Sequence, residues 1–461
     1  TSERQRLAFQ QTNQPYKLFG TLGRATELAE TILRQKGVVL DSLLEDRLVA
    51  EASADPKQRE LVQELTLAKQ RMTQLVIETP SDPSEVSRQQ REKEKEKLSA
   101  KIEQLESNLA RSTAGLGRGR RALAVSVDQI KSALPKQAVL VELVRYSHYL
   151  GRSKEEPRYG AVVIAADRAP QWVPVGNAAD VEKNVQVYQR SVRGITDETT
   201  LSAVLRALHD QIWAPIEKTL PADCKTIIVS PDGELSFVSF ATLLAPHSRF
   251  VCEKYSVRYV ASGRDLLRDK KSTAGLVKTL RIFANADFAG GAGTQAADRN
   301  AVALRSVETR DLQDLSLPSL PGTEKESVEL EARAKQSGWQ PEVILGANAT
   351  EGELRKSDSP RILHLATHGF FLPERQLARP ADTRAASAIP QGRLLNPMQR
   401  SGLALTGAQR TFQSWMKGEV PPTENDGVVT AEEVGGLKLS GTWLVALSAC
   451  ETGSGEAKAG E

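Results

Sequence analysis

The sequence has few cysteines and no long apolar run, and each shortage excludes a class of protein. Its three cysteines, Cys224, Cys252 and Cys450, are far apart and odd in number, which argues against a disulfide framework or a cysteine metal cluster. No apolar segment reaches the roughly 18 residues that a membrane helix needs. The first residues, Thr-Ser-Glu-Arg-Gln-Arg, do not form a signal peptide. We therefore expect a cytoplasmic protein without a membrane partner.

An excess of charge of one sign is also missing. The chain has 61 Lys and Arg residues against 58 Asp and Glu residues, for a net charge of +3. Such a balance provides no strong field toward nucleic acid or an anionic membrane. We therefore do not expect nucleic acid to bind directly. With 461 residues, the chain has room for about three domains, at roughly 150 residues per domain.

Residues 1–56 have the apolar spacing of helices. Apolar side chains recur at helical spacing on either side of Gly37, at Leu28, Ile32, Leu40, Leu43, Leu44 and Leu48. This pattern predicts two amphipathic helices. Two interpretations stay open, the end of a helical-repeat (TPR) array or a plain helical linker, because no repeat of about 34 residues recurs within the chain.

Residues 57–112 predict an antiparallel helical hairpin. Each half carries one apolar stripe, formed by Leu61, Leu65, Met72 and Leu75 in the first and by Leu98, Ile102, Leu105 and Leu109 in the second. Pro80-Ser-Asp-Pro83 turns the chain, and Ser84 is the expected cap of the second helix. The following Gly-, Ser- and Arg-rich stretch predicts a linker over residues 113–130.

From residue 131 to the end, strand and helix patterns alternate. Strands are expected at residues 139–144, 161–166, 225–230, 257–261, 280–284 and 342–345, and helices at residues 178–192, 200–220, 323–337 and 350–356. Alternation of this kind predicts an α/β domain with a mostly parallel sheet that helices cover on both faces. We assign this domain to residues 131–461.

Two later strands end at residues with reactive side chains. Residues 443–447 form an apolar run, expected to be a strand buried on both faces, and Cys450 follows it. A second apolar strand begins after Pro360 and runs through His364, interpreted as core packing, into His368. The carboxyl ends of parallel strands meet at one sheet edge, so neighbouring strands would bring His368 and Cys450 together. An imidazole beside a thiol raises the thiolate fraction and can protonate a leaving amine, which favours a cysteine nucleophile.

These residues resemble the signatures of a known family. His368-Gly369 and Ser448-Ala-Cys-Glu-Thr-Gly453 are similar to the two motifs of the CHAT peptidases, the caspase-like group usually found behind tetratricopeptide repeats. Further similar segments follow in the family's order, at residues 227–240, 320–323, 401–407 and 426–433. The resemblance spans residues 130–461.

The resemblance implies a caspase-like sheet flanked by helices, and a cysteine endopeptidase that needs no metal or organic cofactor. Cys450 would attack the scissile carbonyl of a protein substrate, His368 would act as acid and base, and the N–H groups of Gly369 and Cys450 would stabilise the oxyanion. The helices expected in residues 1–112 form an all-α arm before this domain, and we expect a protein partner to activate the zymogen through that arm. Because the family's domain continues further, we expect a second chain, or chain beyond Glu461, to complete it.

Substrate preference and activity itself stay open. The caspase signature has Gln two positions before its cysteine, where it helps to bind aspartate, whereas this chain has the short, uncharged Ser448. Asp426 is a candidate for a pocket that selects basic residues, although an Asp-Gly pair is also a common turn. Residues 373–426 have little periodicity and are expected to form a lid or a substrate-reading loop. The alternative function is a catalytically inactive scaffold that uses the same domain for assembly.

Overall fold

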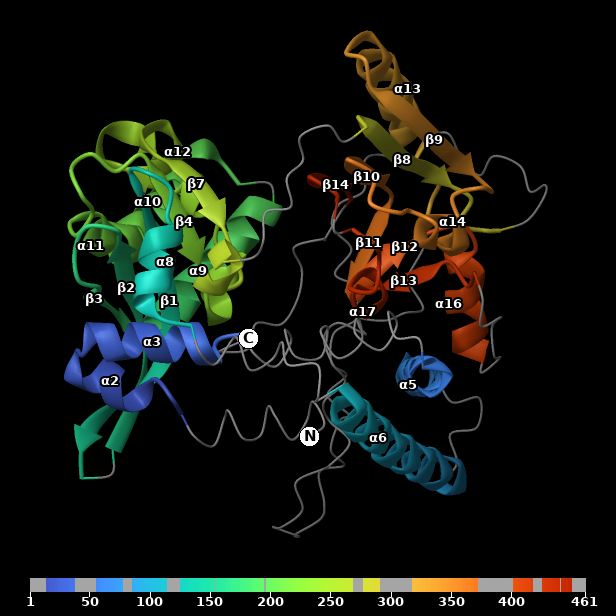
Figure 1. The fold of residues 1–461 in the computed structure, drawn as a ribbon, viewed down its shortest axis with the longest axis horizontal. Helices are drawn as coiled ribbons and strands as arrows, with labels where there is room; N and C mark the ends of the chain where they lie inside the picture. Colours follow the sequence, from blue (N-terminus) through green and yellow to red (C-terminus); the bar gives the residue numbers. More distant parts are fainter. Residues whose placement is uncertain are drawn as a thin grey trace. The chain divides into compact units, whose positions relative to one another are not determined.

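The chain divides into two compact units. The computed structural model describes residues 14–37, 55–77, 85–113, 125–152, 154–194, 196–267, 277–290, 317–371, 401–417, 425–439 and 441–449. The first unit contains Thr1–Val49 and Ala110–Lys270, and the second contains Ala50–Leu109 and Lys271–Gly455. Each unit has its own sheet and its own hydrophobic core (Figure 1). The domain assigned to residues 131–461 is thus divided between two units, because the strands pair into separate sheets rather than one.

The first unit is built on a five-stranded mixed sheet. Its strands, in the order β3-β2-β1-β4-β7, are Gln171–Asn177, Lys154–Ala165, Ala138–Gly151, Thr226–Ser230 and Ser256–Tyr259. β1, β4 and β7 are parallel, whereas β1, β2 and β3 are antiparallel. The turn after β1 has positive φ at Gly151 and Arg152, and so short a connection can join only antiparallel strands. The expected parallel pairing therefore holds on one side of β1 only.

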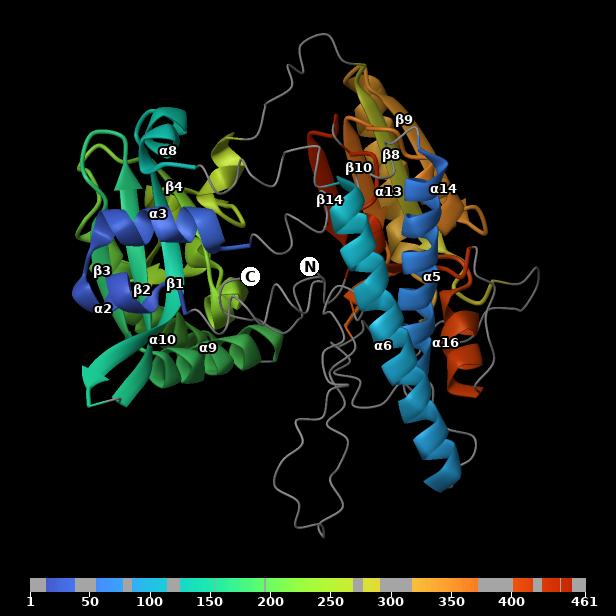
Figure 2. The same ribbon diagram turned by 60° about the horizontal axis from the view of Figure 1, so that its bottom comes forward.

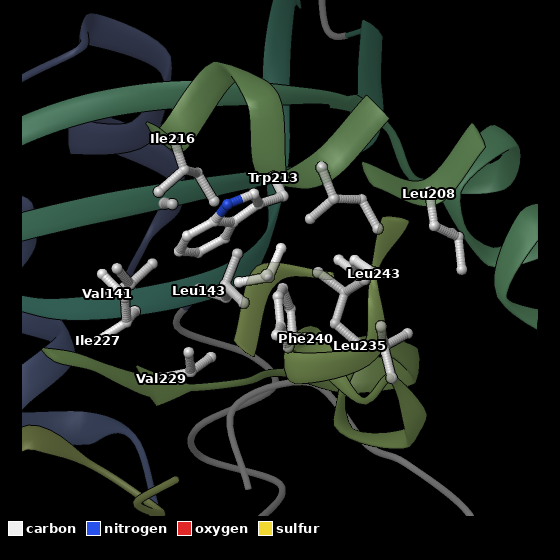
Figure 3. Close-up of a cluster of buried hydrophobic side chains, with 14 of the residues drawn as sticks. Val141, Leu143, Leu208, Trp213, Ile216, Ile227, Val229, Leu235, Phe240 and Leu243 are labelled. Atoms are coloured by element: carbon white, nitrogen blue, oxygen red, sulfur yellow. The ribbon is translucent and has the colours of Figure 1, made fainter. Parts of the chain in front are cut away.

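Helices and short turns pack one face of this sheet. They are α9 (Ala178–Arg193), α10 (Glu198–Leu208), the π-helical turn η2 (His209–Trp213), α11 (Ala214–Glu217), α12 (Val251–Lys254) and the 3-10 turns Gly233–Phe237, Phe240–Thr242 and Pro246–Ser248, with a small ladder of β5 (Leu244–Ala245) and β6 (Arg249–Phe250). Trp213 is fully buried at the centre, edge-on to Phe240 at 6.4 Å (Figure 3). The helix expected at residues 200–220 is interrupted because Pro215 has no N–H to continue the α-helical ladder.

The N-terminal helices belong to the first unit. α2 (Lys17–Leu22) and α3 (Ala25–Gln35), together with α8 (Val127–Ala133), form a second core on the other face of the sheet. Leu28 and Ile32 of α3 are fully buried in this core with Leu140 of β1. The 3-10 turn Gly263–Leu267 lies beside α8. The apolar positions predicted between residues 40 and 48 lie outside the described residues.

The second unit is built on a four-stranded parallel sheet. In the order β14-β10-β8-β9, its strands are Leu444–Ser448, Ile362–Ala366, Thr279–Ala286 and Gln340–Gly346. The helix α13 (Pro321–Gln336) packs Leu330 and Ala334 against one face of β8. A three-stranded antiparallel sheet of β11 (His368–Phe371), β12 (Ser401–Ala404) and β13 (Val428–Thr430) joins the core of the other face, with α14 (Glu351–Arg355), α16 (Ala408–Lys417) and α17 (Ala431–Val434). The predicted fold class, mixed α/β with a largely parallel sheet and an N-terminal helical region, is confirmed.

Two expectations for this unit need correction. The apolar run at residues 443–447 is not buried on both faces, because β14 pairs only with β10 among the described strands. Trp443, Leu444, Val445 and Leu447 are 64%, 43%, 41% and 47% exposed. Within the stretch expected to form a lid, residues 401–417 instead form β12 and α16, which supply Leu403 and Phe412 to the core. The other residues of that stretch, up to 424, lie outside the described part.

The helical hairpin has the expected antiparallel form. α5 (Pro56–Ile77) and α6 (Glu85–Thr113) lie side by side (Figure 2), with Leu65 packed among Leu105 and Leu109. Arg71 and Glu94 pair across the hairpin at 2.9 Å. The predicted turn at Pro80-Ser-Asp-Pro83 and the cap Ser84 lie outside the described residues. None of the helices described here combines the length and apolar character needed to cross a bilayer.

Candidate active site

His368 lies where the chain leaves the parallel sheet. β10 ends at Ala366, and His368 begins β11 by pairing with Ala404 of the neighbouring antiparallel sheet. Thr367, between the two strands, donates its hydroxyl hydrogen bond to the Ala404 carbonyl. The sequence predicts one continuous strand here. In the structure the chain instead crosses at Thr367 from the parallel sheet to the antiparallel sheet, which places His368 at the carboxyl edge of the parallel strands.

The environment of His368 fixes its proton. His368 is 8% exposed, and its ring lies 4.9 Å, centre to centre, from the ring of Phe288. Its Nε2 lies 2.8 Å from the Pro318 carbonyl oxygen. A carbonyl can only accept, so Nε2 carries a proton and Nδ1 is the basic nitrogen of the neutral ring. Burial lowers the pKa of His368, against the opposing effect of the Pro318 hydrogen bond, which favours the neutral base at pH 7.

The register of the parallel strands relates His368 to Cys450. Ala366 of β10 lies opposite Ser448 of β14, and paired strands lie about 4.8 Å apart. His368 comes two residues after Ala366, and Cys450 comes two residues after Ser448. Cys450 itself lies outside the described residues. The roles of Cys450 and of the Gly369 N–H therefore stay predictions that the strand register favours.

Ser448 and His364 contact the same carboxylate. Ser448 Oγ donates to Glu326 Oε2 at 3.2 Å, and His364 Nε2 lies 3.0 Å from Glu326 Oε1. His364 is 9% exposed on β10, so it is buried as expected, but beside a charged group. In the part of the chain that the structure describes, no cluster of three His, Cys, Asp or Glu side chains could hold a metal ion.

Asp426 faces inward and forms a turn. Its Oδ1 accepts the Val428 N–H at 2.7 Å, and Gly427 between them has φ +81°. Burial, together with the nearby charge of Glu433, raises the pKa of Asp426 to about 7. These contacts correspond to the turn interpretation of the Asp-Gly pair, and the pocket role of Asp426 stays a prediction.

A neighbouring buried carboxyl predicts a pH-dependent stability. Burial first, and then the charge of Glu433, raise the pKa of Glu351 to about 8, although Arg355 contacts both carboxyls. A raised pKa means that Glu351 holds its proton more tightly in the folded state than in the unfolded state. The protonated carboxyl therefore stabilises the fold fully at a pH below the pKa of Glu351 in the unfolded chain, and this stabilisation is lost as the pH rises through about 8. Glu351→Gln, which imitates the protonated form, should raise Tm at pH 8 by about 2–4 °C.

Calorimetry at pH 5 and pH 8 checks this prediction. The unsubstituted protein should lose stability between these two values, and Glu351→Gln should flatten the change. Glu329→Gln, a change of an exposed carboxylate in the same unit, serves as the control and should keep the original slope. A Glu351→Gln protein with an unchanged slope contradicts the assignment.

Two residues at the carboxyl edge of the parallel sheet, Pro318 and Glu326, were not predicted from the sequence. Pro318 acts through its backbone carbonyl, which has no side-chain signature, and the nearest signal was the family segment at residues 320–323. Glu326 is one of several charged residues on α13, and only its contacts distinguish it. Both residues reach the site because α13 begins at the same sheet edge, where Thr323 Oγ1 accepts the Asn285 N–H at 2.9 Å.

A comparison of the sequence with known protein families gives a match that covers the segments described above. The CHAT domain family matches residues 202–461, a range that contains the whole four-stranded parallel sheet and the positions of His368 and Cys450. A search of curated proteins finds no match. Since the family match covers more than half of the 461 residues, and the described fold is the mixed α/β arrangement expected of it, this chain belongs to the CHAT domain family.

Proposed function

We propose that this protein is a caspase-like cysteine endopeptidase with Cys450 as nucleophile and His368 as acid and base. The observation that carries the proposal is the fixed tautomer of His368. Its Nε2 is engaged by the Pro318 carbonyl, so that its Nδ1 is the nitrogen available to a thiol. The strand register, which brings Ser448 opposite Ala366, supports the pairing with Cys450.

The reaction follows from these roles. His368 Nδ1 takes the thiol proton of Cys450, and the thiolate attacks the scissile carbonyl carbon. The N–H groups of Gly369 and Cys450 stabilise the resulting oxyanion. The imidazolium then returns its proton to the leaving amine, and a thioester to Cys450 remains. His368 next removes a proton from water, which attacks the thioester, releases the carboxylic acid and restores the thiol.

Alkylation by iodoacetamide tests the proposed nucleophile. Cys252 is exposed and Cys224 is buried, and burial raises the pKa of the Cys224 thiol. A thiolate paired with His368 should make Cys450 react at least about tenfold faster than Cys252 in the full-length protein. Mass spectrometry of the digested protein gives the three rates. His368→Ala should bring Cys450 down to the rate of Cys252, and a Cys450 that is no faster than Cys252 from the outset contradicts the proposal.

The proposed enzyme is regulated through the helical hairpin. The support is a chain of contacts within the second unit. α5 contacts α16, Phe412 of α16 lies edge-on to Phe370 with ring centres 5.4 Å apart, and Phe370 belongs to the same short strand as His368. A protein that binds the hairpin more tightly when these elements are in the active arrangement would shift the site toward that arrangement. Equal Cys450 alkylation rates with and without a candidate partner would exclude that partner as the activator.

An exposed edge also supports a second candidate function. β14 leaves Leu444, Val445 and Leu447 partly exposed, and an apolar edge strand is a template for another strand. We infer that a second chain, or further chain after Glu461, covers this edge and completes the domain. If Cys450 proves unreactive, the same edge favours the alternative of an inactive scaffold that uses the domain for assembly.

A further inference from the structure

A carboxylate lies beside the strand end that leads to Cys450. Glu326, on α13, accepts the hydrogen bond of Ser448 Oγ at 3.2 Å, and Ser448 precedes Cys450 by two residues. The Glu326 side chain is 36% exposed, and Ser448 is also exposed. A ligand can therefore reach this carboxylate from the same sheet edge where the proposed reaction takes place.

The negative charge of Glu326 has no permanent counterion among the described residues. His364 Nε2 is close, at 3.0 Å, but it is not aligned as a hydrogen-bond donor, and no described Lys or Arg pairs with Glu326. Elsewhere on the same helix, by contrast, Glu331 pairs with Lys335 at 2.7 Å. A half-buried carboxylate without a cation is favourably placed to bind one from outside, because partial burial strengthens the pairing.

We propose that Glu326 determines substrate specificity by binding a Lys or Arg side chain of the peptide next to the scissile bond. The inference rests on the proposed peptidase function. Attack by Cys450 requires the scissile carbonyl to lie at its thiol, so the adjoining substrate side chain extends over neighbouring positions of the same strand end. A long cationic side chain reaches Glu326 there, whereas a substrate carboxylate is repelled by it.

Ser448 has a definite part in this arrangement. Its hydroxyl donates to one oxygen of Glu326 and so orients the carboxylate, leaving lone pairs on both oxygens for a guanidinium or an ammonium. The short side chain that could not bind aspartate is thus suited to holding an acidic group. Asp426, the sequence-based candidate for the same preference, has its carboxyl turned to the Val428 N–H instead.

The test compares two covalent probes that differ in one charge. Peptidyl acyloxymethyl ketones with arginine or citrulline next to the reactive ketone have nearly the same shape, but citrulline is neutral. In each, the thiolate of Cys450 displaces the carboxylate leaving group from the methylene carbon and forms a thioether. We expect the full-length protein to react with the arginine probe about 10- to 100-fold faster than with the citrulline probe, as measured by mass spectrometry of Cys450.

Matched variants separate specificity from folding. Glu326→Gln keeps an acceptor for Ser448 but removes the charge, so the ratio of the two rates should fall to about one. The ratio is the readout because any general change in the reactivity of Cys450 affects both probes alike. Glu329→Gln makes the same change at an exposed position of α13 and should keep the ratio.

The possible failures are distinguishable. Equal rates with both probes in the unsubstituted protein, or an unchanged ratio in Glu326→Gln, overturn the role of Glu326 and leave the peptidase proposal standing. A Cys450 that reacts with neither probe, and no faster with iodoacetamide than Cys252, overturns both.

Discussion

Cys450→Ala is expected to lower the rate of peptide cleavage by at least about 10⁴-fold, because removal of a nucleophile leaves only binding and oxyanion stabilisation. The thermal unfolding temperature should stay within about 1 °C of the original, since the change removes one sulfur atom. Cleavage assays and calorimetry on the full-length protein with its activating partner measure both effects. Cys252→Ala, at an exposed cysteine of the first unit, is the matched control and should affect neither.

His364→Ala separates the two histidines. His364 is buried in β10, and its removal leaves a cavity beside Glu326, so we expect a loss of about 1–3 kcal/mol in stability. Any loss of cleavage should follow from unfolding and disappear at lower temperature. If His364→Ala instead abolished cleavage without changing the melting temperature, the catalytic base would have been assigned to the wrong histidine.

Lys36→Ala should destabilise the first unit by about 3–5 kcal/mol, because it leaves a buried carboxylate without its cation. Lys36, just after α3, and Glu142, on β1, are both fully buried, and Lys36 Nζ lies 3.1 Å from Glu142 Oε2. Nζ also donates to Ser230 Oγ at 2.6 Å and to the Leu143 carbonyl at 3.0 Å. Hydrogen exchange of the β1 and β4 amides in increasing denaturant measures the loss within this unit.

Two further variants show whether the unpaired charge is the cause. Adding Glu142→Gln to Lys36→Ala removes that charge and should recover part of the lost stability. The gain is limited because Glu142 Oε1 accepts a hydrogen bond from the Gly263 N–H at 2.6 Å, and a neutral amide oxygen accepts it less strongly than a carboxylate. Lys136→Ala, at an exposed lysine of the same unit, should change stability by less than about 0.5 kcal/mol. A similarly small effect of Lys36→Ala would show that water enters the site and solvates Glu142.

Local patterns in the sequence determined the elements of this protein. The leucine stripes were enough to predict the hairpin of α5 and α6, and the alternation of apolar runs predicted β4, β7, β8, β9 and α13 close to their observed positions. The two family motifs identified His368 and Cys450. These features were readable because side-chain periodicity and short motifs depend on residues near one another in the chain.

Pairing between distant segments decided the rest. One predicted domain became two units, because strands that look alike in sequence joined separate sheets. β14 is as apolar as a central strand, yet it lies at an edge, and no local pattern records which neighbours a strand has. The crossing at Thr367, the Pro318 carbonyl on His368 and the Glu326 carboxylate at Ser448 join residues about 40 to 120 positions apart. Only the tertiary structure brings these groups together, because the polarity of a side chain or carbonyl does not specify which distant group it will contact.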